Sequence, residues 1–218
     1  MKDMLFIKKF PTSILLAIIL LLGSMYLFSG SMTKYPSFIH AWTQSDRLAL
    51  AMNFQERGFD FFHPSTYNLL TKGGITQVDF PIHDYLVSLI SYLFSLDLVF
   101  TFRSYNLLYS LIGLFFFYRI ALRIGISGIR AVFITTFLYT LPFFVYYQNG
   151  SLPSIPSFSN FLIGFYFFIS FLDYRLKRDI ALSAFFLTLA ALARSPYLIF
   201  LIAAPATLLW IQWKNKKI

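Results

Sequence analysis

Long apolar segments divide this chain, and they constrain its fold more than any other feature. Hydrophobic residues make up 58% of the sequence and charged residues only 12%, whereas a soluble domain is about 45–50% apolar and about 25% charged. Because an apolar helix of about 20 residues crosses a bilayer, the pattern predicts an all-α, polytopic transmembrane helix bundle. The candidate segments are residues 12–30, 85–101, 105–121, 130–147, 156–172, 180–193 and 197–213.

The first of these segments follows Lys2, Lys8 and Lys9, as the apolar part of a signal peptide would. Its apolar run has the length of a bilayer span, whereas a secretory signal has an apolar region of about 7–15 residues. We therefore expect residues 12–30 to be a retained transmembrane helix. The chain has no cysteine, which excludes disulfides, thiolate metal sites and a thiol nucleophile.

Basic residues near the segment ends predict the orientation, because short cytoplasmic loops are enriched in Lys and Arg. If residues 85–101 do not cross the membrane, twelve of the 18 Lys and Arg residues fall on the cytoplasmic side. If they do cross, the basic clusters after residues 118 and 174 and at the C-terminus all move outside. The twelve are Lys2, Lys8, Lys9, Arg119, Arg123, Arg130, Arg175, Lys177, Arg178, Lys214, Lys216 and Lys217.

We therefore predict about six spans in the cell (inner, cytoplasmic) membrane, with both termini cytoplasmic. Residues 85–101 then form an interfacial or re-entrant helix on the outer side, and an ordinary span there is the alternative. Because the basic residues lie in small clusters at span ends, they do not form a nucleic-acid-binding face. No linker or repeat divides residues 1–218, so we expect one membrane domain.

Between the first span and the five further spans of residues 105–213 lies a long polar loop, residues 31–104. A helix is expected over residues 45–57, with Ser45 as its N-cap, Asp46 in its first turn and Gly58 as its stop. Gly73 and Gly74 predict a turn. The loop holds six of the nine carboxylates, namely Asp46, Glu56, Asp60, Asp79, Asp84 and Asp97.

Asp46 is the strongest candidate for chemistry, because a carboxylate beside the membrane can act as a general base. Trp42, Gln44 and Asn53 suit the apolar face and the hydroxyl groups of a sugar. The alternative is that Asp46, next to Arg47, only compensates the dipole at the start of a helix.

Two other groups of residues are candidates for ligand binding. Asp79 and His83, with neighbouring acids and imidazoles, could hold a divalent metal ion, although no fixed ligand spacing is present; internal hydrogen bonding of the loop is the alternative. Arg194 lies on the outer side in the predicted topology, where its guanidinium suits a phosphate. A snorkelling arginine at the lipid headgroups is the alternative.

Short motifs follow one another in an order that resembles a known family. They are Trp42-x-Gln44-x-Asp46, Asn53-Phe54, Gly58 to Pro64, Asp79-Phe80-Pro81 with Tyr85-Leu86, Arg103 heading a span, and an outer turn from Tyr147 to Pro153. Together they resemble the bacterial polyprenyl-phosphate-dependent glycosyltransferases of the GT-C fold, of the protein-mannosyltransferase and aminoarabinose-transferase type (glycosyltransferase family 39-like). The resemblance runs from about residue 9 to residue 213 and covers the N-terminal membrane portion of such enzymes, which are usually much longer.

This resemblance implies an inverting transfer of a sugar from a polyprenyl-phosphate donor to a glycan, lipid or protein acceptor of the cell envelope. Asp46 matches the family's catalytic base, and Arg47 and Arg194 are candidates to stabilise the leaving phosphate. Relatives often carry an acid after the proline of the second outer turn, where this chain has Ser154. A non-catalytic membrane protein that binds a polyprenyl lipid, or that serves as a subunit of an assembly or transport complex, is the rival expectation.

Overall fold

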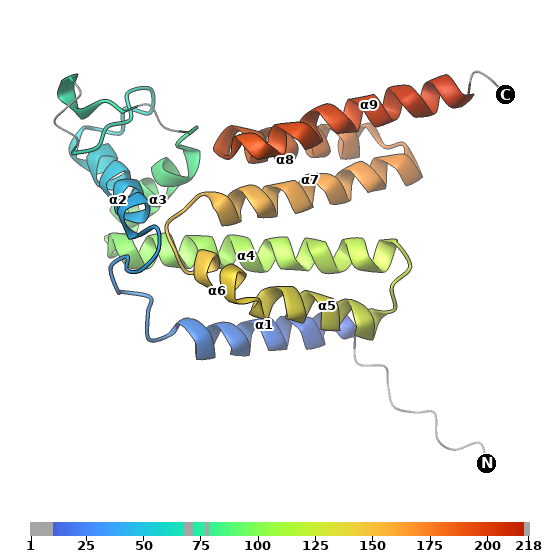
Figure 1. Ribbon diagram of the computed structural model, residues 1–218, viewed down its shortest axis with the longest axis horizontal. Helices are drawn as coiled ribbons and strands as arrows, with labels where there is room; N and C mark the ends of the chain where they lie inside the picture. Colours follow the sequence, from blue (N-terminus) through green and yellow to red (C-terminus); the bar gives the residue numbers. More distant parts are fainter. Residues whose placement is uncertain (1–10, 68–71, 77–78, 216–218) are drawn as a thin grey trace, which may run out of the picture.

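The computed structural model of the chain describes residues 11–67, 72–76 and 79–215 (Figure 1). Over these residues it contains α-helices and short 3₁₀ turns but no β-strand, and its one isolated β-bridge joins Ser65 to Ile75. The predicted all-α class is confirmed.

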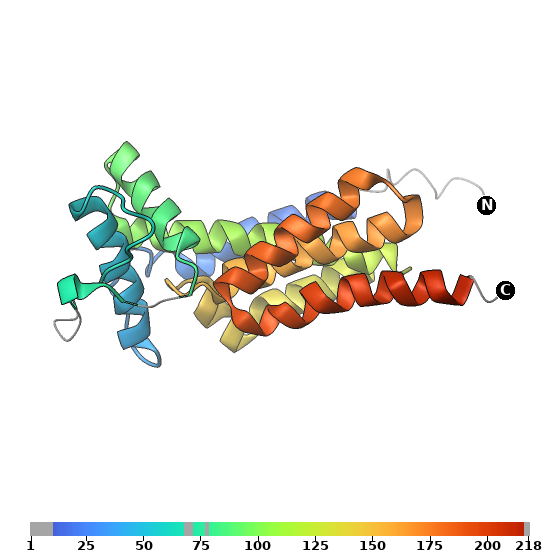
Figure 2. The same ribbon diagram turned by 90° about the horizontal axis from the view of Figure 1, so that it is seen from above.

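Long helices lie side by side along the molecule and form a bundle (Figures 1 and 2). Within the described residues, α4 (Leu98–Arg123) and α7 (Ser154–Tyr174) are long and apolar enough to cross a membrane. The α5–α6 pair would make a third span, while α1 and residues 195–211 are apolar but shorter. Multi-pass character thus has support, and the count of six spans stays a prediction. The helices are α1 (Thr12–Phe28), α4 (Leu98–Arg123), α5 (Gly128–Thr140), α6 (Pro142–Gln148), α7 (Ser154–Tyr174), α8 (Lys177–Ala193) and α9 (Leu198–Asn215).

Close packing between α4 and α7 depends on a small residue. A Cβ atom on Gly113 would lie 2.8 Å from Ser159 Cβ and 3.0 Å from Ser159 Cα, which is closer than side chains normally approach. Buried Leu16, Leu114 and Tyr118 continue this core towards α1. Small side chains at such positions let transmembrane helices approach closely.

One predicted span is bent in the structure. Residues 130–147 were expected to form a single helix, but α5 and α6 meet at an angle of 71°. The break falls at Leu141 and Pro142. Proline has no backbone N–H and clashes with the preceding turn, so it starts a helix more readily than it continues one.

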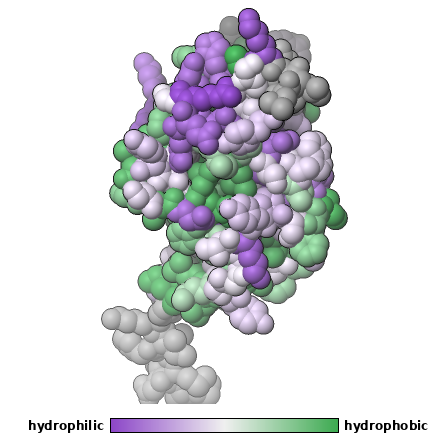
Figure 3. Space-filling model, turned by 90° about the vertical axis from the view of Figure 1, so that its left-hand side faces the viewer, coloured by the Kyte–Doolittle hydropathy of each residue, from purple (hydrophilic) through white to green (hydrophobic). Residues whose placement is uncertain are grey.

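The polar loop folds into a cap at one end of the bundle (Figures 1 and 2). The cap contains α2 (Ala41–Glu56), the 3₁₀ turn Lys72–Gly74 and α3 (Ile82–Phe94). In Figure 3, which views this end of the molecule, hydrophilic residues gather over the upper part. The predicted turn at Gly73 and Gly74 is present, and both residues have positive φ angles.

The predicted helix over residues 85–101 is two helices. The first, α3, ends at Phe94, and the next residue, Ser95, has a left-handed backbone (φ 52°). Asp97 then caps α4 by accepting a hydrogen bond from Phe100 N at 2.7 Å. The boundary expected between residues 104 and 105 therefore lies inside α4. The first turns of α4 belong to the cap, where Val99 and Phe102 pack on Leu48 and Val87.

The basic clusters of the short connections lie at the opposite end of the bundle. The start of α1, the α4–α5 and α7–α8 connections and the end of α9 all lie there (Figure 1). Arg123 pairs with Asp173 at 3.1 Å, which joins the ends of α4 and α7. This separation of a polar cap from a basic end fits the predicted topology.

The topology predicts opposite labelling of two exposed aromatic positions. Because the chain lacks cysteine, Phe62→Cys in the cap and Tyr174→Cys at the basic end each give one reporter thiol, and both positions are exposed. A membrane-impermeant maleimide should label the first variant in intact spheroplasts and the second only after permeabilisation. The reverse pattern would contradict the orientation.

Candidate functional site

An arginine at the base of the cap connects two acidic side chains. Arg47 of α2 donates from Nη1 to Asp84 Oδ2 at 3.2 Å and from Nη2 to Asp79 Oδ2 at 3.3 Å. Arg194, at the end of α8, lies 3.8 Å from Asp79 Oδ2 through its Nη1. We call Asp84, Arg47, Asp79 and Arg194 the ion-pair chain. It connects three parts of the cap to the bundle.

The position of Arg47 follows from the helical period of α2. Gln44, Leu48, Ala51 and Phe54 are buried along one stripe, and Arg47 lies on the same stripe. Leu48 and Ala51 pack against Val87 of α3 and the first turns of α4. A stripe with this spacing directs its side chains to one face, so the Arg47 side chain enters the interface between α2 and α3.

Burial shifts the pKa values of two neighbouring residues in opposite directions, because it favours the neutral form of each side chain. It raises the pKa of the Asp84 carboxyl from 3.8 to about 6, although the positive charge of Arg47 opposes the rise. Burial, with repulsion from Arg47, lowers the pKa of His83 from 6.5 to about 4. His83 is therefore neutral near pH 7, where its Nδ1 shares a 2.8 Å hydrogen bond with the Tyr105 hydroxyl.

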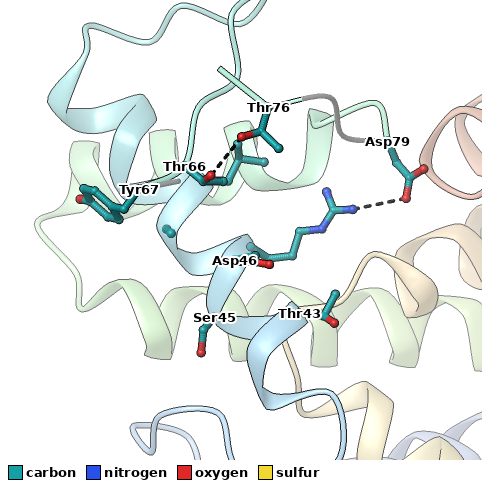
Figure 4. Close-up of a pocket in the computed structure, with 10 residues that line it drawn as sticks. Thr43, Ser45, Asp46, Thr66, Tyr67, Thr76 and Asp79 are labelled. Carbon is teal, nitrogen blue, oxygen red and sulfur yellow. Dashed lines mark hydrogen bonds and ion pairs between the residues drawn. The ribbon is translucent and has the colours of Figure 1, made fainter. Parts of the chain in front are cut away.

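A polar cavity of about 700 Å³ lies beside the ion-pair chain (Figure 4). Six residues of α2 line one side, and the segment after α2 supplies the other side with Thr66, Tyr67, Thr76 and Asp79. We call it the Asp46 cavity. Asp46 is exposed there, and within the described residues its carboxylate makes no ion pair or hydrogen bond. The α2 residues are Thr43, Ser45, Asp46, Arg47, Ala49 and Leu50.

A second cavity, of about 530 Å³, lies next to the first, and we call it the Arg194 cavity. Thr43 lines both cavities. Arg194 Nη2 donates to Ser154 Oγ at 3.1 Å, while its Nε is buried and has no hydrogen-bond partner among the described residues. The lining is His40, Thr43, Tyr147, Leu152, Ser154, Arg194, Pro196 and Tyr197.

The outer turn between α6 and α7 forms one wall of the Arg194 cavity, and buried amides hold it in place. Asn106 of α4 donates from Nδ2 to Gly150 O at 2.6 Å and to Leu152 O at 3.2 Å. Gln44 donates to Tyr146 Oη at 2.9 Å and accepts from Ser151 N at 3.3 Å. A Cβ on Gly150 would lie 2.8 Å from Gln44 Oε1, so this turn fits tightly against α2.

The structure corrects the predicted start of the helix that carries Asp46. Residue 45 was expected to be the N-cap, but α2 begins at Ala41 after His40, whose φ is 61°. Asp46 therefore lies beyond the first turn. The buried stripe extends upstream to Gln44, and its partners Tyr146 and Ser151 are distant in the sequence, so the local pattern gave no sign of the additional turn.

The predicted site residues fall into two groups. Arg47 and Asp79 line the Asp46 cavity, and Arg194 lies beside it. Gln44 faces the outer turn instead. The remaining three also lie elsewhere: Trp42 is 72% exposed, Asn53 lines a third cavity with Asp60 and His63, and His83 is buried between α3 and α4.

The residues proposed to hold a metal do not converge. Within the described residues no three His, Cys, Asp or Glu side chains form a group that could hold an ion. Asp79 and Asp84 both face Arg47, and His83 faces Tyr105. These side chains fit an ion-pair network, and the metal requirement stays untested.

The sequence analysis missed several cavity residues. Thr43 could have been found, because it lies one turn before Asp46 and Arg47 on the same helix. Tyr147 and Tyr197 lie at the ends of apolar segments and line the Arg194 cavity. Thr66 and Thr76 carried no sequence signal, since their place depends on the fold of the loop.

Comparisons with known proteins found no similarity: no protein-family model matches the chain, and no curated protein or solved structure matches it either.

The opposite pKa shifts predict opposite pH dependences in two variants. Asp84 has a raised pKa, so its contribution to folding stability is lost as the pH rises from about 4 to about 6. His83 has a lowered pKa, so its contribution is gained as the pH rises from about 4 to about 6.5. Each contribution is about 3 kcal/mol, and the two largely cancel in the unsubstituted chain.

Thermal unfolding of purified Asp84→Asn should therefore show stability that increases with pH over this window. His83→Gln should show stability that decreases with pH. Unfolding followed by circular dichroism at pH 4, 5, 6 and 7 measures both trends. Parallel pH trends in the two variants would contradict the assigned shifts.

Proposed function

We propose that this chain is a membrane glycosyltransferase that moves a sugar from a polyprenyl-phosphate donor to an acceptor at the outer face of the membrane. The acceptor is an envelope glycan, lipid or protein. One observation carries the proposal: Asp46 is an exposed carboxylate without an ion-pair partner among the described residues, and it lines a polar cavity next to a second cavity that contains Arg194.

Asp46 is assigned as the general base. The acceptor hydroxyl oxygen attacks the anomeric carbon of the sugar, and its proton passes to the Asp46 carboxylate. The bond between the anomeric carbon and the phosphate oxygen breaks, and its electron pair leaves with the polyprenyl phosphate. Attack from the face opposite the phosphate inverts the anomeric configuration. A base must reach the hydroxyl directly or through one water, and the exposure of Asp46 permits this.

Arg194 is assigned to the phosphate that leaves. Its buried Nε lacks a hydrogen-bond partner within the described residues, and its Nη1 lies at the long distance of 3.8 Å from Asp79. The guanidinium therefore retains donors for an anion. Arg47 was the other candidate, but its guanidinium is engaged by two carboxylates. We assign Arg47 to positioning α2.

Both cavities contain polar side chains that suit a sugar and a phosphate, beside apolar surface. Thr43 and Ser45 supply hydroxyl groups from α2, and Thr66 and Thr76 supply others from the following segment. Tyr147 and Tyr197 add aromatic faces in the Arg194 cavity. Hydroxyl groups can both donate and accept hydrogen bonds, as sugar hydroxyls require.

Asp46→Asn separates chemistry from folding, because it keeps the shape of the side chain and removes its basicity. Turnover should fall roughly 10²–10⁴-fold, the usual contribution of a general base. The assay is release of undecaprenyl phosphate by the purified chain in proteoliposomes, tested with a panel of undecaprenyl-phosphate-linked sugars. Asp60→Asn is the matched control, because Asp60 is an exposed cap acid that pairs with His63 away from the Asp46 cavity.

Near-normal turnover of Asp46→Asn would contradict the assignment, and Asp79, which lines the same cavity, would be the next candidate base. The rival function, a non-catalytic protein that binds a polyprenyl lipid or acts as a subunit of an assembly or transport complex, predicts donor binding without turnover in any form of the chain.

A further inference from the structure

A cavity at the boundary between the cap and the bundle gathers two cations. It has a volume of about 320 Å³ and lies where α1 ends, between α4 and α6. Arg103 of α4 and Lys34, from the segment after α1, supply the positive charge. Ser31, Tyr35 and Asn149 add polar groups, and no Asp or Glu is among the described residues that line it. We call this the Arg103 cavity.

Arg103 is nine-tenths buried, yet no carboxylate among the described residues pairs with its charge. Its Nη2 donates to Lys34 O at 2.6 Å and its Nη1 to Asn149 O. Both acceptors are neutral carbonyls, and no ion pair of Arg103 occurs within the described residues. Buried charges in proteins are normally paired. A guanidinium has five N–H groups, so these two bonds leave it able to donate further.

The surroundings of the cavity are those of a membrane interface. Leu27, Phe28 and Val145 form its apolar side. Tyr35 and Phe38, which also line it, are 75% and 89% exposed. Exposed aromatic residues of this kind gather at the level of the lipid headgroups.

An apolar surface continues from the cavity along α1 towards the middle of the bundle. Leu21, Leu22 and Met25 are exposed on this helix, whose sequence is mostly apolar. A lipid whose headgroup occupied the cavity would place its acyl chains against this surface.

We propose that the Arg103 cavity binds the phosphate of an anionic phospholipid from the outer leaflet. The planar guanidinium matches the geometry of a phosphate, and Lys34 adds a second charge. Because the bound group compensates Arg103, the lipid stabilises the contact of α4 with Lys34 and with the outer turn at Asn149. The inference requires the bundle to lie in a bilayer, but it does not depend on sugar transfer.

This site is distinct from the proposed donor site. The Arg103 cavity shares no residue with either the Asp46 cavity or the Arg194 cavity. Gln44 lines the Arg103 cavity, while Thr43 and Asp46, on either side of it in α2, line the others. The α2 helix therefore lies between the Arg103 cavity and the two cavities of the proposed donor site.

The test is binding of phosphatidylglycerol to the detergent-purified chain, measured by native mass spectrometry. Lys34→Gln should weaken binding about fivefold, the effect of one basic residue near a lipid surface. Arg103→Lys should weaken it about tenfold, because lysine loses the planar fork. Lys72→Gln, which replaces another exposed lysine of the cap outside this cavity, should bind as the unsubstituted chain does.

Zwitterionic phosphatidylcholine should bind more weakly than phosphatidylglycerol, and glycerol 1-phosphate should not compete. Unchanged phosphatidylglycerol affinity in Lys34→Gln would overturn the proposal, whether or not Arg103→Lys folds. Competition by glycerol 1-phosphate would indicate a site for free phosphate and would also overturn it. The proposal would also be overturned if Lys34→Gln lost binding of undecaprenyl phosphate but kept binding of phosphatidylglycerol. The cavity would then be part of the site for the sugar donor.

Discussion

The placement of the cap depends on the ion pairs of one buried arginine. Arg47 lies between Asp79 and Asp84, and Asp79 continues the contact to Arg194 at the end of α8. Next to Asp79 in the chain, Phe80 N donates to Leu192 O at 3.3 Å. A buried ion pair adds little net stability, but loss of one partner costs about 3–5 kcal/mol because the other charge stays buried. The network therefore favours one placement of the cap over others.

The burial of Arg47 also explains the exposure of Asp46. Consecutive residues of an α-helix point about 100° apart, so when Arg47 faces α3 its neighbour faces the cavity. The same helix directs Gln44 to the outer turn. A single helix thus positions the candidate base, the ion-pair chain and the contact with the bundle. The ion pairs of Arg47 are therefore one of the contacts that place Asp46, together with the hydrogen bonds of Gln44 and the packing of Leu48 and Ala51.

The sequence predicted those features that arise from local composition. Apolar segments marked the long helices, and basic clusters marked the end of the bundle opposite the cap. The break at Ser95 was missed because residues 85–101 are apolar enough to read as one helix, and only the Asp97 cap and the left-handed Ser95 separate them. The proline at position 142 could have predicted the bend, but the apolar residues on both sides of it led to the prediction of one continuous helix.

The residues of the candidate site were predictable in part, but their contacts were not. Asp46, Arg47 and Asp79 stood out as polar residues in one loop. Their division into an exposed carboxylate and a buried ion pair depends on contacts between α2, α3 and the end of α8. Gln44 was expected to contact a sugar, but its partners are Tyr146 and Ser151, about a hundred residues away. Local pattern carries no information on such partners.

A double-mutant cycle on Arg47 and Asp84 tests most directly whether this pair holds the cap. The unfolding free energy would be measured for Arg47→Met, Asp84→Leu and the combined variant. We expect a coupling of roughly 0.5–3 kcal/mol, with the combined variant recovering part of the loss caused by either single change, since neither charge then stays buried alone. Strictly additive losses would show that the two side chains are neighbours without a stabilising interaction, and would contradict the account.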